Sequence, residues 1–167
     1  VTKDIYPKYN KPRHFVKLGR KKIERLIKRI GIFRVKAKSI FYLSKTLVEK
    51  YKGNVPKTYG ELEQLPGVGH KTASVVMSQG FGFPAFPVDT HIHRLSQRWG
   101  FTNGKNVIQT EKDLKEIFPK TYWNKLHLQI IWYGREYCKA RDCYGITCKI
   151  CRSCYPNRKK PIKTKKA

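Results

Sequence analysis

The chain has 167 residues, with 37 Lys and Arg against 11 Asp and Glu, and a formal net charge of +26. A hydrophobic content of 40% can supply a folded core and excludes a wholly disordered chain, and no apolar run is long enough to span a membrane. The positive charge favours a polyanionic partner, above all nucleic acid. An AT-rich genome would also encode many lysines, so this inference rests on the sign of the charge rather than on its size.

Apolar residues recur at helical spacing along most of the chain, and no useful stretch alternates as a strand would. Helices are predicted over 21–30, 35–51, 71–79, 90–98, 110–117 and 122–133, with a short one from Thr58. Asp89 is suited to cap the 90–98 helix, and the 122–133 helix is apolar enough to be buried. The basic segment 157–167 is predicted to be mobile. These patterns predict an all-α fold with a cysteine-rich loop near the C-terminus.

A glycine-rich turn separates two of these helices, in the sequence Leu65-Pro66-Gly67-Val68-Gly69-His70-Lys71. Glycine adopts positive φ values at low energy, so the turn can be tight and another backbone can approach it closely. The N–H groups that open the following helix have no intrahelical partner and suit a phosphate. An ordinary helix corner is the alternative, but the full string L-P-G-V-G-x-K-T-A favours phosphate binding.

Two reactive side chains accompany this turn, Lys71 in the first turn of the next helix and Asp89 at the start of the helix after it. An amine can attack the anomeric carbon of a deoxynucleotide and form a Schiff base. A carboxylate can stabilise positive charge on the sugar or move protons to and from the amine. Lys71 could instead be a surface lysine that contacts phosphate. Asp89 as a helix cap is compatible with catalysis, and the pair indicates an enzyme that acts on DNA.

Three segments together resemble the bacterial endonuclease III family: 65–73, 88–92 and Gly134-Arg135-x-x-Cys138. That family comprises helix-hairpin-helix DNA glycosylases with abasic-site lyase activity, which excise oxidised pyrimidines. The resemblance extends from near Val1 to Pro156, and it implies that Lys71 is the nucleophile and Asp89 the conserved carboxylate. Adenine-removing mismatch glycosylases share the hairpin and the aspartate but lack this lysine. The residues implied to hold DNA phosphate are Leu65, Gly67, Val68, Gly69 and His70.

The resemblance also singles out Ile32 and His91. Ile32 aligns with a residue that family members push into the gap left by a flipped nucleotide, where an apolar side chain replaces part of the lost stacking. Packing at a helix corner is an equal alternative for Ile32. His91 resembles a histidine beside the base pocket, and a structural role is an equal alternative there too.

All five cysteines crowd into one C-terminal segment, spaced C-x4-C-x4-C-x2-C-x2-C, which favours metal binding over disulfides. Four thiolates at such spacing bind a [4Fe–4S] cluster or a zinc ion. Cluster-bearing family members show C-x6-C-x2-C-x5-C, and this chain departs from that pattern because Gly145 stands at the second position. The expected ligands of a [4Fe–4S] cluster are Cys138, Cys148, Cys151 and Cys154. Cys143 is the alternate ligand, and zinc is the less favoured metal.

Four segments are predicted: 1–20, a partial N-terminal helix and its connection; 21–105, a helical domain with the hairpin; 106–156, C-terminal helices with the cluster loop; and 157–167, a basic tail. Relative to the family, the chain is expected to lack N-terminal helices, which would leave apolar surface exposed. We expect excision of oxidised pyrimidines from double-stranded DNA and cleavage of abasic sites, by a monomeric bacterial protein in the cytoplasm, on the nucleoid, without a membrane partner. The alternatives are a non-catalytic helix-hairpin-helix nucleic-acid-binding module and an inactive truncated relative.

Overall fold

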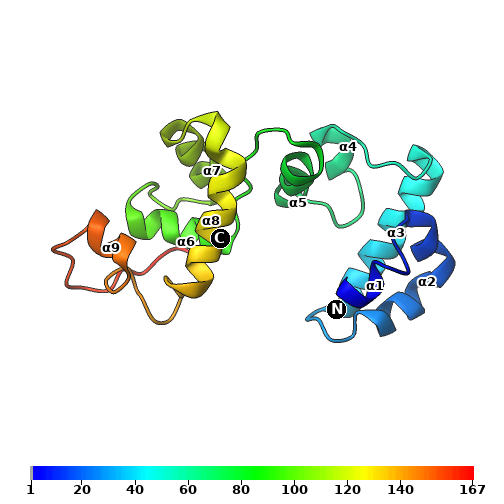
Figure 1. Ribbon diagram of the computed structural model, residues 1–167, viewed down its shortest axis with the longest axis horizontal. Coiled ribbons are helices and arrows are strands. Elements are labelled where there is room, and N and C mark those ends of the chain that lie inside the picture. Colours follow the sequence, from blue (N-terminus) through cyan, green and yellow to red (C-terminus); the bar gives the residue numbers. More distant parts are fainter. Residues whose placement is uncertain (1) are drawn as a thin grey trace. The chain divides into compact units, whose positions relative to one another are not determined.

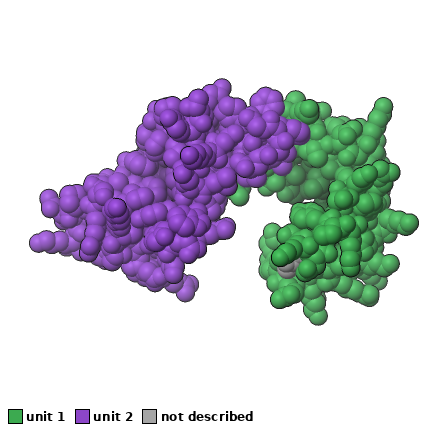
Figure 2. Space-filling model, viewed as in Figure 1, with its two compact units in different colours: residues 1–73 green, residues 74–167 purple. Residues whose placement is uncertain are grey.

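The computed structural model describes residues 2–167, and this part of the chain forms helices and no strand (Figure 1). The all-α prediction is therefore confirmed. Contacts divide the chain into two units, residues 2–73 and residues 74–167 (Figure 2). Among the described residues, no helix combines the length and the hydrophobicity needed to cross a membrane. The four segments expected from the sequence stay a prediction.

The first unit is built on two helices that pack against each other, α2 (Pro12–Leu26) and α3 (Phe33–Tyr51). The unit also contains the short helices α1 (Thr2–Ile5) and α4 (Tyr59–Glu63), and α5 (His70–Val75) begins at its end. The buried centre consists of Ile5, Ile23, Ile27 and Ala37. Helix α2 ends four residues before the predicted boundary, because the chain turns at residues 27–32 to enter α3.

The second unit is centred on α6 (Thr90–Trp99), which is buried along most of its length. Around it lie α7 (Val107–Ile117), α8 (Trp123–Glu136) and α9 (Lys149–Cys154). A π-helical turn (Val76–Gly80) follows α5, and a 3-10 turn (Lys120–Tyr122) precedes α8. The core contains aliphatic and aromatic side chains together with four cysteines. Helix α6 therefore connects the helical core with the cysteine loop.

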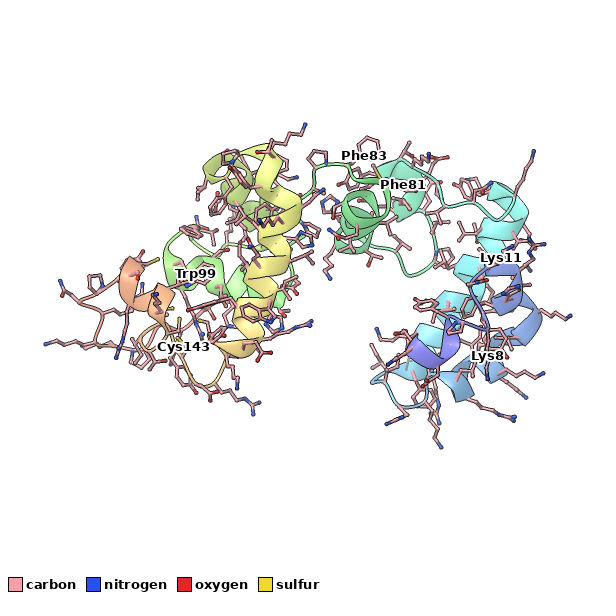
Figure 3. All side chains as sticks on the ribbon, in the orientation of Figure 1. Lys8, Lys11, Phe81, Phe83, Trp99 and Cys143 are labelled. Carbon is pink, nitrogen blue, oxygen red and sulfur yellow. The ribbon has the colours of Figure 1, made fainter. Side chains whose placement is uncertain are left out.

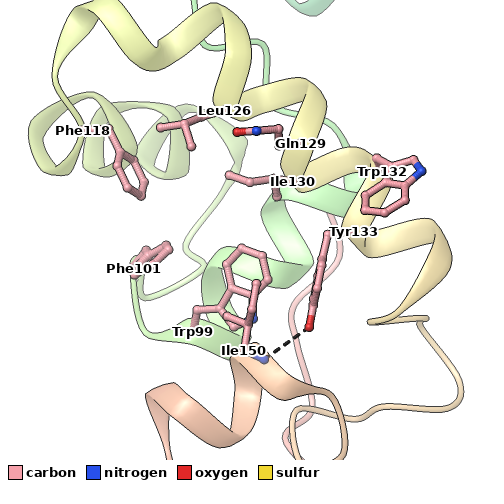
Figure 4. Close-up of a pocket in the computed structure, with 9 residues that line it drawn as sticks. All are labelled: Trp99, Phe101, Phe118, Leu126, Gln129, Ile130, Trp132, Tyr133 and Ile150. Atoms are coloured by element: carbon pink, nitrogen blue, oxygen red, sulfur yellow. Dashed lines mark hydrogen bonds between the residues drawn. The ribbon is translucent and has the colours of Figure 1, made fainter.

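Helix α8 is only partly buried, which contradicts the prediction for 122–133. Ile130 and His127 face the core, whereas the side chains of Leu128 and Trp132 are 48% and 56% exposed. An apolar groove of about 410 Å³ runs beside the helix, between α8 and residues of α6 and α9 (Figure 4). One face of α8 packs on α6, and the described residues leave the other face open.

The basic tail is also ordered where mobility was predicted. From the end of α9 the chain returns along α6, as the red segment of Figure 1 shows. The side-chain amide of Gln97 pairs with the backbone of Lys165, with Lys165 N–H donating to Oε1 at 2.7 Å and Nε2 donating to Lys165 C=O at 3.1 Å. We call residues 155–166 the strap.

Candidate functional site

The hairpin between α4 and α5 has the tight geometry that its glycines predict. Gly67 has a φ of 77°, and a Cβ added there would lie 2.6 Å from Ser39 Cβ, so only glycine fits against α3. The turn is closed by the Val68 N–H, which donates to Leu65 C=O at 3.0 Å. Gly67 and Gly69 are exposed, whereas the Leu65 side chain is 4% exposed. Leu65 can therefore contact a ligand only through its backbone, and its side chain anchors the hairpin.

His70 ties the start of α5 to α4. Its Nδ1 lies 2.8 Å from Glu63 Oε1, and its ring stacks on Tyr59 with the ring centroids 5.7 Å apart. The side chain of His70 is still 58% exposed. These contacts hold the first turn of α5, where the unpaired backbone N–H groups lie.

Lys71 follows on the exposed side of the same turn. The sequence predicts one regular helix over 71–79, but the structure has α5 followed by a π-helical turn. Ala73 is buried and marks the inward face of α5, whereas Lys71 is exposed and does not belong to that face. The π-helical turn begins at Val76, directly after α5, and such turns occur frequently at functional sites.

Asp89 belongs to the second unit and caps α6 there, as predicted. Its Oδ1 accepts hydrogen bonds from the backbone N–H groups of His91 and Ile92, each at 2.9 Å. Both bonds use the same oxygen, and Oδ2 has no hydrogen-bond partner among residues 2–167. Capping therefore leaves one carboxylate oxygen for chemistry. Lys71 belongs to the first unit and Asp89 to the second.

Ile32 does not pack into the helix corner. Its side chain is 72% exposed, and its φ of 51° places a β-branched residue in the left-handed region. Such a conformation is a genuine outlier for isoleucine, because Cβ crowds the backbone. The corner-packing alternative is thus excluded, and the role of a wedge in DNA stays a proposal.

His91 has structural contacts in the second unit. A Cβ added to Gly134 would lie 3.3 Å from His91 Cβ, so the glycine allows α8 to approach α6 closely. Arg94 lies beside the same ring, with Nη2 3.5 Å from His91 Nδ1. These contacts give His91 and Gly134 a packing role, and the role of His91 beside the base pocket stays a prediction.

Four of the five cysteines form a candidate metal centre in the second unit, and Figure 3 labels one of them, Cys143. Their sulfur atoms all lie within 4.8 Å of one another, and all four residues are buried. The group is Cys138, Cys143, Cys148 and Cys151. Cys154, which we expected as a ligand, is exposed and lies outside the group, and the alternate, Cys143, takes its place.

The loop conformation explains this correction. Tyr144 and Gly145 have φ values of 47° and 84°, and two consecutive left-handed residues reverse the chain directly after Cys143. The reversal brings Cys143 beside Cys148, whose backbone N–H donates to Cys143 Sγ at 3.4 Å. The x4 spacing in the sequence did not reveal so tight a turn.

Two arginines on α6 hold this loop, and the sequence analysis missed them. Arg98 is 2% exposed, and its guanidinium donates to Cys138 Sγ at 3.2 Å and to the carbonyl oxygens of Lys139 and Ala140 at 2.9 and 3.0 Å. Arg94 donates to Gly134 C=O and Cys138 C=O at 3.0 and 2.9 Å. A buried cation needs such partners, and it favours negative charge on the nearby thiols. The signal was present in the i, i+4 spacing of these arginines, which places both on one face of α6.

The four thiols do not titrate alike. A hydrogen bond from the Cys151 thiol, helped by Arg98, lowers the pKa of Cys138 to about 5 against the effect of burial, and the same contact raises the pKa of Cys151. Burial would raise the pKa of Cys143, but hydrogen bonds with Thr147 and with backbone N–H groups outweigh it and give about 7. Burial raises the pKa of Cys148. The site therefore already stabilises thiolate at Cys138, and thiolate is the form that binds metal.

The donor set and its spacing suit a metal ion. Cys138 Sγ and Cys143 Sγ each lie 3.8 Å from Cys151 Sγ. A single tetrahedral metal with bonds of about 2.3 Å also sets its sulfur ligands about 3.8 Å apart. In a [4Fe–4S] cluster each thiolate binds a different iron, so these sulfur atoms would have to move apart.

The sequence of this chain is similar to those of known DNA repair proteins. A family model described as HhH-GPD superfamily base excision DNA repair protein matches residues 1–120. Endonuclease III of Bacillus subtilis (strain 168) is 41% identical over 164 residues, which cover 98% of this chain and 75% of that protein. Endonuclease III of Escherichia coli (strain K12) is 41% identical over 141 residues, which cover 84% of this chain and 67% of that protein.

Solved structures agree with the sequence relatives. A non-covalent endonuclease III–DNA complex and a trapped endonuclease III–DNA covalent intermediate each match with a TM-score of 0.83 and 41% identity, over 89% of this chain and 70% of that chain. A thermostable thymine-DNA glycosylase matches with a TM-score of 0.75 and 25% identity. The matched family model covers the hairpin and Asp89 and ends before the cysteine loop.

Proposed function

The chain belongs to the endonuclease III family of the HhH-GPD superfamily and is a base-excision DNA glycosylase and abasic-site lyase, and we propose that Lys71 is its nucleophile, Asp89 its catalytic carboxylate and oxidised pyrimidines in duplex DNA its substrates. The observation that carries these assignments is an exposed lysine in the first turn of the helix after the hairpin. The trapped covalent intermediate of a solved relative supports a covalent step.

In the proposed reaction, Lys71 Nζ attacks C1′ of the flipped nucleotide, and the glycosidic bond breaks as the base takes its electron pair. The sugar ring opens to a Schiff base between Nζ and C1′. Loss of a C2′ proton then expels the 3′ phosphate and cuts the strand on the 3′ side of the abasic site. The Asp89 carboxylate stabilises positive charge on the sugar and moves protons to and from the amine.

DNA binding is proposed for the hairpin and for Ile32. The exposed glycines Gly67 and Gly69, and His70 after them, present backbone N–H groups to a phosphate, while Val68, whose own N–H closes the turn, holds the shape of the loop. Exposed Ile32 fills the gap left by the flipped nucleotide, where an apolar side chain replaces part of the lost stacking. Leu65 supports the hairpin from beneath.

For the cofactor we propose a [4Fe–4S] cluster held by the four grouped cysteines, because family members of this kind carry one. Its role is to fix the loop between α8 and α9. Zinc is the second candidate, because four thiolates also suit a tetrahedral zinc ion. Iron and zinc content, measured together with absorption in the iron–sulfur charge-transfer region, separates the two.

The function is tested by adding borohydride while the protein reacts with duplex DNA that contains an abasic site. Wild-type protein is expected to form a stable covalent adduct, because borohydride reduces the imine between Nζ and C1′. Denaturing gels measure the adduct and the cut strand. A protein that cuts efficiently and never traps would contradict the lysine mechanism, and one that binds DNA but neither cuts nor traps would support a non-catalytic module.

The two roles of Asp89 predict different results for two variants. Asn at this position keeps an oxygen that can cap α6, so the free energy of unfolding should change by only a few tenths of a kcal/mol, whereas Ala should cost about 0.5–2 kcal/mol. Both should reduce base excision by at least roughly 10²-fold, because each removes the charge. Thermal unfolding and single-turnover excision measure the two effects. Normal excision by Asp89→Asn would show that Asp89 acts only as a helix cap and has no catalytic role.

A further inference from the structure

The strap is attached to the second unit at several points. Beyond the Gln97–Lys165 pair, the Ile162 N–H donates to Tyr144 C=O at 2.9 Å, in the reversal that places Cys143. A Cβ added to Gly145 would lie 2.5 Å from Ile162 Cγ2, so the strap packs directly onto that turn. The segment is therefore a built element and not a free tail.

Arg158 provides the central attachment. One of its guanidinium nitrogens donates to Arg98 C=O at 2.7 Å and to Gly145 C=O at 3.1 Å. Its guanidinium carbon also lies 3.7 Å from the centre of the Tyr155 ring. The Arg158 side chain therefore donates hydrogen bonds to backbone carbonyl oxygens of the protein and holds the strap in place.

The remaining charges of the strap face outward. Ile162 and Thr164 are half-buried and alternate with exposed Lys163 and Lys165. Because side chains of an extended segment alternate between its two faces, anchoring one face exposes the other. The exposed cations are Lys159, Lys160, Lys163, Lys165 and Lys166. Residues 155–166 contain no acidic side chain that could neutralise them.

We propose that the strap is a DNA-backbone-binding surface, on which anchored lysines contact the phosphates of duplex DNA in addition to the hairpin. The proposal rests on the proposed function, since that function makes duplex DNA the ligand. Lysines on an anchored segment lose less conformational freedom on binding than lysines on a flexible tail. Each phosphate contact therefore contributes more to the binding free energy. Such contacts release counterions and are independent of sequence.

The test compares two variants that remove the same charge. The strap variant carries Lys→Gln at Lys159, Lys160, Lys163 and Lys166. The control variant carries Lys→Gln at Lys105, Lys112, Lys120 and Lys125, which are exposed in the same unit. Lys165 is kept because its backbone forms the anchor. The measurement is the dissociation constant for undamaged duplex DNA over a range of salt concentrations.

The salt slope is the magnitude of d log K/d log[salt], where K is the association constant, and each lost phosphate contact lowers it by about 0.9. We expect the strap variant to lower the slope by roughly 2 or more and to weaken binding by roughly tenfold or more near 0.1 M salt, and the control variant to lower the slope by less than about 1. Equal changes in the two variants would overturn the proposal, because they would reflect net charge alone.

A third variant, Gln97→Ala, keeps every strap lysine and removes the Gln97–Lys165 pair. It should raise hydrogen exchange at the Lys165 amide and lower the salt slope part of the way. Faster exchange with an unchanged slope would show that anchoring is irrelevant and would contradict the proposal. Borohydride trapping at saturating protein concentration tests the catalytic assignment independently of the strap. Normal trapping by the Gln97→Ala variant together with an unchanged salt slope would reject the strap proposal alone. A wild-type protein that never traps would reject the catalytic assignment, and the salt slopes could still be compared.

Discussion

Glutamine in place of Lys71 is expected to abolish borohydride trapping and to reduce abasic-site cleavage by at least roughly 10³-fold, the scale on which loss of a catalytic nucleophile is felt. The amide has a similar length but cannot form an imine with C1′. Because Lys71 is exposed, the folded state should be unaffected, and thermal unfolding should match that of the wild type.

The matched control for this prediction is Lys45→Gln, which removes an exposed lysine from α3 in the same unit. It should trap and cleave normally. Binding of an uncleavable abasic analogue by Lys71→Gln should stay within about fivefold of the wild type, since one phosphate-directed charge is a small part of the total. Full cleavage by Lys71→Gln would assign the nucleophile elsewhere, and a loss of binding as large as the loss of cleavage would make Lys71 a phosphate contact.

Serine in place of Cys151 should abolish stoichiometric metal binding and lower the stability of the second unit by several kcal/mol, because binding of a structural metal contributes directly to folding free energy. Cys151 is fully buried, and its sulfur lies 3.8 Å from two other sulfur atoms of the group. Elemental analysis, the visible spectrum and thermal unfolding are the measurements.

Cys154→Ser is the control, since this thiol is exposed and lies outside the group. It should retain the metal content, spectrum and stability of the wild type. Loss of the metal from Cys154→Ser would restore the ligand set expected from the sequence, in which Cys154 stands in place of Cys143.

Several features could be predicted because they depend on residues close together in the chain. A carboxylate before a helical repeat caps that helix through N–H groups two and three residues away, and Asp89 does so. The positive φ of Gly67 follows from the L-P-G-V-G string in the same way. The helical periods located the main elements, although the π-helical turn after α5 and the early end of α2 do not follow from hydrophobic spacing.

What the sequence by itself determined is the set of candidate groups: a glycine-rich hairpin, a lysine and an aspartate after it in the chain, and thiols that can bind a metal. Only the tertiary structure decided which thiols meet, because two consecutive left-handed residues bring Cys143 inward. It also showed that Arg98 is buried against the cysteine loop and that the strap is anchored through Gln97. These contacts join residues far apart in the chain, and their free energy depends on burial and hydrogen-bond geometry that exist only in the folded state.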